Sequence, residues 1–289
     1  MTIIPMVYDT ILLRYGEIFL KGGNKGIFER KLVENIAKIL KNEGVSGLKV
    51  RNSRGRMLMP YFSAHAALRR VFGLVSYSPA VHVEKDTAQI QAKAVQLLRG
   101  RRGTFKVSTK RSDKSFPITS PEFNRIVGEQ VEKEMELLFS SSSPDVVLEI
   151  EINQEGAYLF FETVLCGGGL PTGVEGKVLL LVENEASLLA GLLFMKRGCR
   201  VIPVAFKESR ISDISLLQAF NPDELKLHMV KNFQELEGLA AKKEISILVT
   251  GQVLDDENHK INLTLMKPLV AYSKKQIQEQ LKRYRSLVQ

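Results

Sequence analysis

The spacing of hydrophobic residues in the N-terminal part of the chain changes between the period of a strand and the period of a helix. Residues 28–40 carry apolar side chains four positions apart, which is typical of one face of a helix, and Gly44 follows as a stop signal. The predicted elements are strands at residues 8–14, 48–50, 57–59 and 74–83 and helices at residues 28–40 and 64–72. This order (strand, helix, two strands, helix, strand) is that of a small ferredoxin-like domain.

The middle of the chain is predicted to hold a strand with one apolar and one cationic face. Phe105 and Val107 are spaced for a strand and are predicted to face a core. Lys106, Ser108 and Lys110 alternate with them and are predicted to face outward. The neighbouring predicted elements are a helix at residues 86–98, a helix capped by Ser120, and strands at residues 146–152 and 157–163. The outward face would offer a row of partners for phosphate groups.

The last third of the chain has the pattern of a parallel α/β layer. An unbroken apolar run at residues 177–181 is followed by a polar hexapeptide at 182–187 and by further apolar positions at 188–196. This pattern predicts a buried strand, a tight loop and a helix. The remaining predicted elements are strands at residues 201–206 and 245–249, a helix at 222–242 and a basic amphipathic helix at 274–289. Alternation of strands and helices predicts a reduced, Rossmann-like parallel sheet, so the chain combines α+β and α/β parts.

The loop at residues 182–187 follows the first parallel strand, where α/β folds bind nucleotides, but its composition opposes a phosphate. Phosphate binding there uses glycines, which let backbone N–H groups approach the anion, and this loop contains none. Glu183 and Glu185 stand there instead. Each carboxylate–phosphate pair at ~5 Å would repel by roughly 3 kcal/mol at an effective dielectric constant of ~20, so ATP in the ordinary pose is disfavoured. The two glutamates either satisfy the start of the next helix or belong to a loop reshaped for a cation or a non-phosphate ligand.

The charge of the chain favours a polyanionic partner. Its 289 residues carry a formal net charge of +9, and 44% are hydrophobic, which is typical of a soluble protein with two or three domains. The excess of cations points to nucleic acid, with a generic basic surface as the alternative. The chain has no apolar stretch long enough to cross a bilayer and no leader sequence at its N-terminus, so we expect a cytoplasmic protein without a membrane partner.

Cysteine and histidine give no sign of a metal site or of catalysis. Cys166 and Cys199 are the two cysteines of the sequence, and neither lies in a cluster with the spacing of metal ligands. We expect both to be small packing residues rather than nucleophiles. The histidines are scattered along the chain. No catalytic or metal-binding residue is therefore predicted.

Several separated motifs resemble the tRNA 4-thiouridine synthetase (ThiI-like) family. They are LLRYGEIFLKG at residues 12–22, KRSDKSFP at 110–117, NRIVG at 124–128, GGLPTGVEGK at 168–177 and MKRG at 195–198. The resemblance runs nearly from end to end, and its motifs occur in the family's order. It is therefore far more specific than a single signature would be.

The resemblance implies an N-terminal ferredoxin-like domain, a THUMP RNA-binding domain and an adenylating α/β domain of the PP-loop type. The corresponding expected boundaries are residues 1–80, 81–165 and 177–289, with a glycine-rich linker at 166–176. In this family the first two domains hold the acceptor end of tRNA, and the third adenylates uridine before sulfur transfer. The expected phosphate contacts are Lys106, Lys110, Arg111 and Lys114, with Arg14, Lys21, Arg54 and Arg56 extending the basic surface.

The sequence departs from the family at the loop that would carry the activity. The family's pattern Ser-Gly-Gly-X-Asp-Ser aligns with Val182, Glu183, Asn184, Glu185, Ala186 and Ser187. Only Ser187 matches, so the backbone cradle for pyrophosphate is missing and the PP-loop is degenerate. Thr250 and Gly251 match a later loop of the family and form either a remnant adenosine pocket or a turn that supports the fold. The sequence also stops without the family's later cysteine loop or the rhodanese domain of some members.

These features predict a tRNA-binding protein on a thiouridine-synthetase scaffold whose catalytic domain has degenerated and holds no cofactor. The alternative is an active enzyme of tRNA thiolation, or of the related sulfur supply for thiamine, that binds ATP and Mg²⁺ by an unusual route or through a partner. A third hypothesis is a scaffold, as a homodimer or with a partner PP-loop enzyme, that presents tRNA to another protein.

Overall fold

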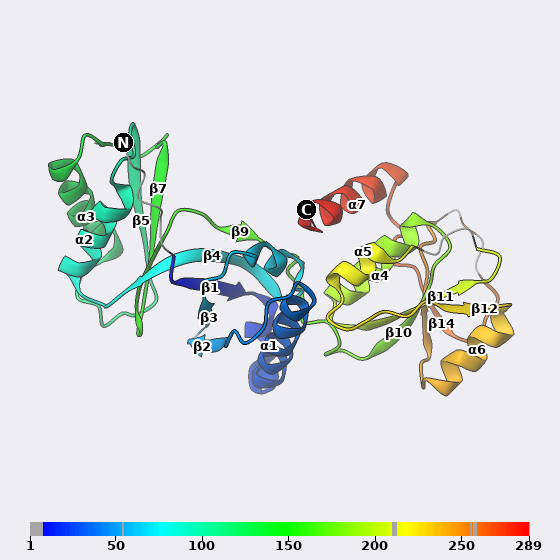
Figure 1. Cartoon of the computed structure of the whole chain (residues 1–289). Coiled ribbons are helices and arrows are strands. Elements are labelled where there is room, and N and C mark those ends of the chain that lie inside the picture. The colour runs from blue at the N-terminus through cyan, green and yellow to red at the C-terminus, as the bar shows by residue number, and fades with distance from the viewer. Residues whose placement is uncertain (1–7, 54, 210–212, 255, 257–258, 289) are drawn as a thin grey trace. The chain divides into compact units, whose positions relative to one another are not determined.

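The computed structural model of the chain describes residues 8–53, 55–209, 213–254, 256 and 259–288. The chain divides into two units (Figure 1). The first unit comprises Met1–Leu13, Lys49–Ser63 and Tyr77–Val164, and the second comprises Arg14–Leu48, Ala64–Ser76 and Leu165–Gln289. The predicted ferredoxin-like segment therefore contributes to both units.

The strands of the first unit build a mixed sheet, to which the ends of β1, β4 and β9 also belong. Its elements are β1 (Thr10–Tyr15), β2 (Arg51–Ser53), β3 (Arg56–Pro60), β4 (Leu74–Val83), α2 (Thr87–Leu98), β5 (Thr104–Arg111), α3 (Ser120–Glu134), β6 (Leu138–Phe139), β7 (Val146–Asn153), β8 (Gly156–Phe160) and β9 (Val164–Leu165). The sheet runs β2-β3-β1-β4-β8-β7-β5-β6, with β9 beside β4. The apolar sides of α2 and α3 pack with β5, β7 and β8 in one core, and Figure 1 shows both helices on the same side of these strands.

The predicted hairpin exists, but its first strand was placed too early. The sequence predicted residues 48–50, whereas β2 occupies Arg51–Ser53 and pairs with β3 through Ser53 and Arg56. Gly55 adopts a positive φ of 91°, which a residue with a side chain rarely adopts. The turn is therefore short, and the strands begin directly beside it.

The second unit contains a fully parallel sheet. Its elements are η1 (Glu17–Asn24), α1 (Lys25–Asn42), η2 (His65–Arg70), β10 (Lys177–Leu181), α4 (Glu185–Lys196), β11 (Arg200–Phe206), α5 (Ser215–Phe220), β12 (His228–Val230), α6 (Phe233–Lys242), β13 (Ile247–Val249), β14 (Thr264–Met266) and α7 (Lys274–Val288). The strand order is β12-β11-β10-β13-β14, and each neighbouring pair is parallel. Within the described residues, no helix is both long and apolar enough to cross a membrane.

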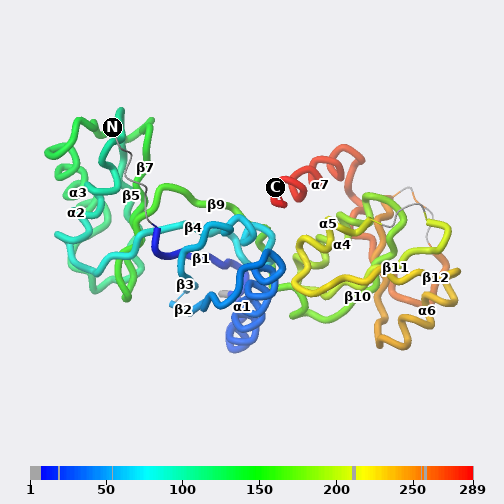
Figure 2. The backbone as a smooth tube through the Cα atoms, viewed as in Figure 1, coloured from blue at the N-terminus to red at the C-terminus, as the bar shows by residue number. Residues whose placement is uncertain are grey.

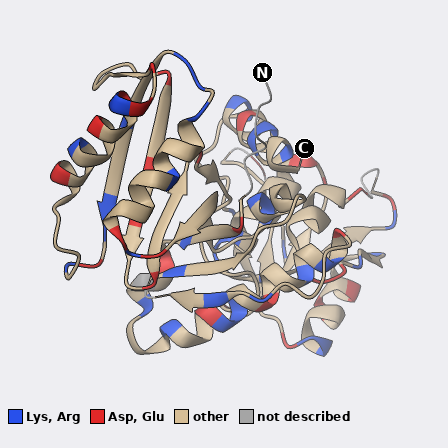
Figure 3. Cartoon of the chain, turned by 60° about the vertical axis from the view of Figure 1, so that its left-hand side comes forward, with Lys and Arg blue, Asp and Glu red and all other residues tan. Residues whose placement is uncertain are grey.

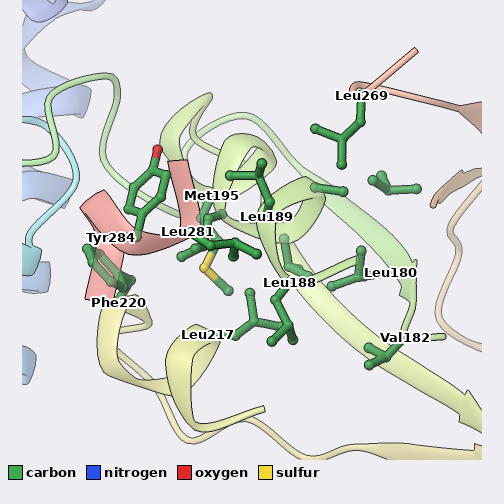
Figure 4. Close-up of a cluster of buried hydrophobic side chains, with 14 of the residues drawn as sticks. Leu180, Val182, Leu188, Leu189, Met195, Leu217, Phe220, Leu269, Leu281 and Tyr284 are labelled. Carbon is green, nitrogen blue, oxygen red and sulfur yellow. The ribbon is translucent and has the colours of Figure 1, made fainter. Parts of the chain in front are cut away.

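The central strand β10 is buried on both faces, as its unbroken apolar sequence predicted. Leu180 and Val178 join a core with α4, α5 and α7, part of which is shown in Figure 4. Leu179 and Leu181 join a second core with α6. Because the strand order reverses between β10 and β13, the loops that follow these two strands meet at the topological switch point of the sheet.

The single helix predicted over residues 222–242 is wrong. β12 occupies part of this range and pairs in parallel with the end of β11, and α6 begins only at Phe233 (Figure 2). Asn232 sets this boundary, since its Oδ1 accepts a hydrogen bond from the backbone N–H of Glu235 at 2.9 Å. Apolar residues at Leu225, Met229 and Phe233 imitate the period of a helix across a strand and a turn.

Three aromatic rings connect distant segments of the second unit. The ring of Phe72, which follows η2, stacks on that of Phe220 at the end of α5, with 5.3 Å between centroids. Tyr284 of α7 meets Phe220 edge-on at 5.4 Å and Phe72 at 6.2 Å. Such pairs add to the free energy gained from burial alone. The amphipathic helix predicted at residues 274–289 is confirmed as α7, and this cluster holds it.

Phe220→Ala should lower the free energy of unfolding of the second unit by about 3–5 kcal/mol, because a large buried ring is replaced by a cavity. Urea denaturation followed by circular dichroism measures the change. Leu20→Ala is the control, since the Leu20 side chain is 86% exposed and its truncation should change little. Equal stability of the two variants would contradict the role given to the aromatic cluster.

Candidate functional site

The two faces of β5 differ as the sequence predicted. Phe105 and Val107 are buried in the core beneath α2 and α3. Lys106, Ser108 and Lys110 lie at the alternate positions, and Lys110 is the most exposed of them, with 72% of its side chain accessible. The predicted orientation of all five side chains is therefore confirmed.

Carboxylates of the neighbouring strand share the cationic face of β5. The parallel register places Glu149 of β7 beside Ser108 and Glu151 beside Lys110. The Ser108 hydroxyl donates to Glu149 Oε2 at 3.0 Å, and Lys110 Nζ lies 4.0 Å from the same oxygen. The outer face is thus a row of alternating charges rather than a purely cationic strip, which sequence alone did not indicate.

Two of the four cations predicted on this strand and its loop donate hydrogen bonds to backbone carbonyl oxygens. Arg111 Nη1 donates to the carbonyl oxygens of Phe116 and Ile118 at 2.5 and 2.8 Å. Lys106 Nζ donates to the carbonyl oxygen of Ser141 at 3.2 Å. Arg111 therefore fixes the loop between β5 and α3 from within. Lys114, in that loop, is exposed.

Asp113 anchors the same loop. Its side chain is 5% exposed, and it accepts hydrogen bonds from Lys85 Nζ at 2.5 Å and from the backbone N–H and hydroxyl of Ser115 at 2.9 and 2.7 Å. These contacts, with Lys85 first and Ser115 next, lower the pKa of Asp113 to about 2. On α3, Asn124 Oδ1 accepts the backbone N–H of Thr109 at 2.8 Å. The motifs KRSDKSFP and NRIVG therefore build a fixed loop that presents Lys110 and Lys114.

The other predicted phosphate contacts come from the ferredoxin-like segment. Arg56 Nε donates to Glu151 Oε2 at 3.1 Å, and Arg54 lies outside the described residues. Arg14 and Lys21 belong to the second unit, where Lys21 Nζ lies 2.9 Å from a carboxylate oxygen of Glu175. Figure 3 shows basic and acidic positions interspersed along the ribbon. The role of each of these cations in RNA binding stays a prediction.

The loop at the switch point satisfies its own backbone. Ser187 Oγ accepts hydrogen bonds from the backbone N–H groups of Glu183 and Asn184 at 3.1 and 3.4 Å. Asn184 Oδ1 in turn accepts the Ser187 N–H at 3.1 Å, which completes a capping box at the start of α4. Three N–H groups of the loop, those of Glu183, Asn184 and Ser187, are therefore already bonded within it.

The two glutamates of this loop contact side chains from distant segments: Glu185 contacts Arg285, and Glu183 contacts His259. Glu185 Oε1 lies 2.8 Å from Arg285 Nη2 of α7, and this contact, followed by that with Gln278, lowers the pKa of Glu185. Glu183 Oε2 lies 3.3 Å from His259 Nε2. One prediction from the sequence was that the glutamates satisfy the start of the helix. The capping hydrogen bond comes from Asn184 instead, so this prediction is wrong as far as hydrogen bonds are concerned. Glu185 still lies in the first turn, where a negative charge is favourable.

Gly251 lies directly against this loop. A Cβ atom at Gly251 would lie 2.4 Å from the backbone nitrogen of Ser187, so the two loops of the switch point meet backbone to backbone. Thr250 is fully buried, and its N–H donates to the Met266 carbonyl oxygen at 3.1 Å. These contacts are consistent with a turn that supports the fold, and the alternative of a remnant adenosine pocket at Thr250 and Gly251 stays a prediction.

Sequence reasoning missed two features of this loop for different reasons. Asn184 followed three residues later by Ser187 is a local N-cap pattern and could have been recognised. His259 and Arg285 lie far along the chain from their partners, and no local pattern connects them. Only the fold brings these side chains close to Glu183 and Glu185.

Family models describe most of the N-terminal half. The ThiI ferredoxin-like domain matches residues 10–78, and the THUMP domain matches residues 84–162. Fold and domains together define a THUMP-domain protein of the ThiI type. The chain is 31% identical to a probable tRNA sulfurtransferase of Moorella thermoacetica over 96% of its own length and 84% of that protein. The chain belongs to the tRNA sulfurtransferase family.

Other relatives are longer than this chain. The probable tRNA sulfurtransferase of Brevibacillus brevis is 38% identical over 70% of this chain, which spans 52% of that protein. The relative in Macrococcus caseolyticus is 35% identical over 82% of this chain, which spans 63% of it. The chain thus spans between about half and two thirds of these two curated relatives.

Two solved structures share the fold. The crystal structure of PH1313 from Pyrococcus horikoshii matches with a TM-score of 0.83 and 29% identity, over 95% of this chain and 99% of that one. A 4-thiouridine synthetase–RNA complex with bound ATP matches with a TM-score of 0.79 and 25% identity, over 97% of this chain and 86% of that one. The predicted combination of ferredoxin-like, THUMP and parallel α/β parts is confirmed.

Asp113→Asn should destabilise the first unit in a pH-dependent manner. The pKa of Asp113 falls from 3.8 to about 2 on folding, so its stabilising contribution is fully present above pH 3.8 and is lost as pH falls through about 2. The difference in unfolding free energy between wild type and variant should shrink over this window in urea titrations. Exposed Glu136→Gln is the control. A difference that does not change with pH would contradict the assigned contact with Lys85.

Proposed function

We propose that the chain is a tRNA-binding member of its family that does not bind ATP in the manner of a PP-loop enzyme. The RNA half of the proposal is supported by the THUMP domain and by the likeness to the solved 4-thiouridine synthetase–RNA complex. The loop from Val182 to Ser187 carries the second half. There the N–H groups of Glu183 and Asn184 are bonded to Ser187 Oγ.

Two physical terms oppose a nucleotide phosphate at this loop. A phosphate that approached the N–H groups of Glu183, Asn184 or Ser187 would have to displace the capping box, because these groups are already bonded within the loop. It would also stand beside Glu183 and Glu185, whose present partners, His259 and Arg285, would have to be shared or released. We therefore propose that neither ATP nor Mg²⁺ belongs to the resting protein.

In the proposed RNA interface, Lys110 and Lys114 contact phosphates. Both are exposed, and Lys110 has only a 4.0 Å contact with Glu149 to release. Arg111 and Arg56 act indirectly, since they hold the loop and the neighbouring strand through Phe116 and Glu151. Phosphate contacts of this kind position RNA but carry little sequence information.

In an NMR titration, ATP–Mg²⁺ should leave the backbone amide resonances of Glu183, Asn184 and Ser187 unchanged in the wild-type chain, with or without tRNA. These resonances should also stay unchanged in Glu183→Gln/Glu185→Gln, because the N–H groups remain bonded to Ser187 Oγ. Micromolar ATP binding at this loop in the wild type, seen as shifts of these resonances, or release of AMP that depends on tRNA, would contradict the proposal and favour an active tRNA sulfurtransferase. Binding by the double variant alone would show that the carboxylates, and not the capping box, exclude ATP.

The affinity for tRNA should fall steeply with salt, and Lys110→Gln/Lys114→Gln should flatten the dependence. Removing each cation that neutralises a phosphate should reduce the slope of log K against log salt by about 0.7 to 0.9. Lys133→Gln is a matched control, because this exposed lysine lies on α3, which covers the opposite face of β5. Filter binding between low and physiological salt measures the slopes. A flat plot for the wild type, or equal slopes for the Lys110/Lys114 and Lys133 variants, would reject this interface.

A further inference from the structure

A cavity of about 520 Å³ lies at the amino ends of the parallel strands in the second unit. Its walls come from the starts of β10 and β11, from residues 221–228 and from the C-terminal end of α6. The switch-point loop lies at the carboxyl ends of the same strands. The cavity is therefore a separate feature of the sheet, of a size typical for small-ligand sites.

The cavity is lined by five cations that have no ion pair. They are Lys177, Arg200, Lys226, Lys242 and Lys243. Among the described residues, no carboxylate forms a salt bridge with any of them, whereas nearby Lys38 lies 2.7 Å from Asp223. The acidic side chains that line the same cavity are Glu224 and Glu244, and both are exposed. The lining thus has more cations than carboxylates and carries a net positive charge.

Lys177 and Arg200 place two like charges side by side at the rim of the cavity. They are register partners on adjacent parallel strands, which lie about 4.8 Å apart. Like charges side by side on a sheet repel each other. Lys242 lies in the last turn of α6, where a positive charge is favourable.

The backbone at the rim of the cavity is also unusual. Glu244 has a φ of 56°, which among the described residues makes it the one non-glycine residue with a positive φ. This position follows the end of α6, where glycine is the usual residue, and the N–H of Ile245 donates back to the Ala240 carbonyl oxygen at 2.9 Å. The tight turn places Lys242 and Lys243 on the cavity wall.

The pKa of His228 responds to the electrostatic potential inside the cavity. Burial lowers the pKa of its imidazole, and the charges of Lys243 and Lys226 lower it further. A neutral imidazole can still donate one hydrogen bond to an anion. His228, at the start of β12, can therefore act as a hydrogen-bond partner for an anion. Its pKa should change when a negative charge enters the cavity.

We propose that this cavity binds phosphate groups, with Arg200 and Lys177 as the principal ligands. A guanidinium matches two phosphate oxygens at once, and the lysines add point charges around them. The source of the phosphate is either a free oligophosphate or the backbone of bound RNA. This site does not depend on the THUMP interface or on the state of the switch-point loop.

The test uses inorganic triphosphate as the free probe and tRNA as the second. Lys177→Gln/Arg200→Gln should weaken triphosphate binding at least about tenfold in calorimetry. Lys275→Gln/Lys282→Gln is the matched control, because it removes two exposed cations from α7, outside the cavity. Triphosphate should also raise the pKa of His228, followed by its imidazole resonances in NMR, since a bound anion offsets Lys226 and Lys243.

The tRNA arm identifies the source of the phosphate. If the cavity variant loses more tRNA affinity than the control and triphosphate competes with tRNA, the ligand is the RNA backbone. If triphosphate binding alone is abolished, the ligand is a free oligophosphate. Equal behaviour of both variants toward both probes, with an unchanged pKa of His228, would overturn the proposal. If tRNA binding depends on Lys110 and Lys114 alone, the cavity can still bind free triphosphate. Each of the two proposals can therefore fail while the other holds.

Discussion

The burial of β10 on both faces is the constraint on which the second unit depends. Leu180 packs with α4, α5 and α7, and Leu179 packs with α6, so every helix of the layer is held against one strand and its neighbours. A strand buried in this way has no freedom to shift its register, because a slip by one residue would exchange its two faces. The positions of Lys177 at one end and Val182 at the other are therefore fixed by packing.

The two ends of β10 lie at edges of the parallel sheet that differ in their electrostatics. At the carboxyl edge, the start of α4 would attract an anion, but Glu185 already supplies the negative charge and Arg285 balances it. At the amino edge, Lys177 and Arg200 lie side by side, and no carboxylate in the part of the chain that the structure describes forms a salt bridge with either. The edge that binds nucleotides in related folds is thus internally satisfied, and the edge that usually has no ligand carries the unbalanced charge.

Local patterns predicted most of the fold because each depended on neighbours in sequence. The alternation from Phe105 to Lys110 and the apolar run at 177–181 were correct, since solvent and core select the faces of a strand directly. Residues 222–242 were misassigned because Leu225, Met229 and Phe233 satisfy a helical period while β12 is held by pairing with β11. The ion pairs of Glu183 and Glu185 could not be foreseen, because their partners lie far along the chain.

The same limit explains why charge alone did not define the RNA interface. Lys110 and Arg111 are adjacent cations, yet successive side chains of a strand point to opposite faces. Arg111 is therefore bound to the carbonyl oxygens of Phe116 and Ile118, whereas Lys110 is exposed. Glu149 and Glu151 further reduce the charge of the outer face, because they lie beside Ser108 and Lys110. In the proposed interface, the loop held by Arg111 and Asp113 would fix the position of Lys110 and Lys114, and these two cations would supply contacts to phosphates without reading the RNA sequence.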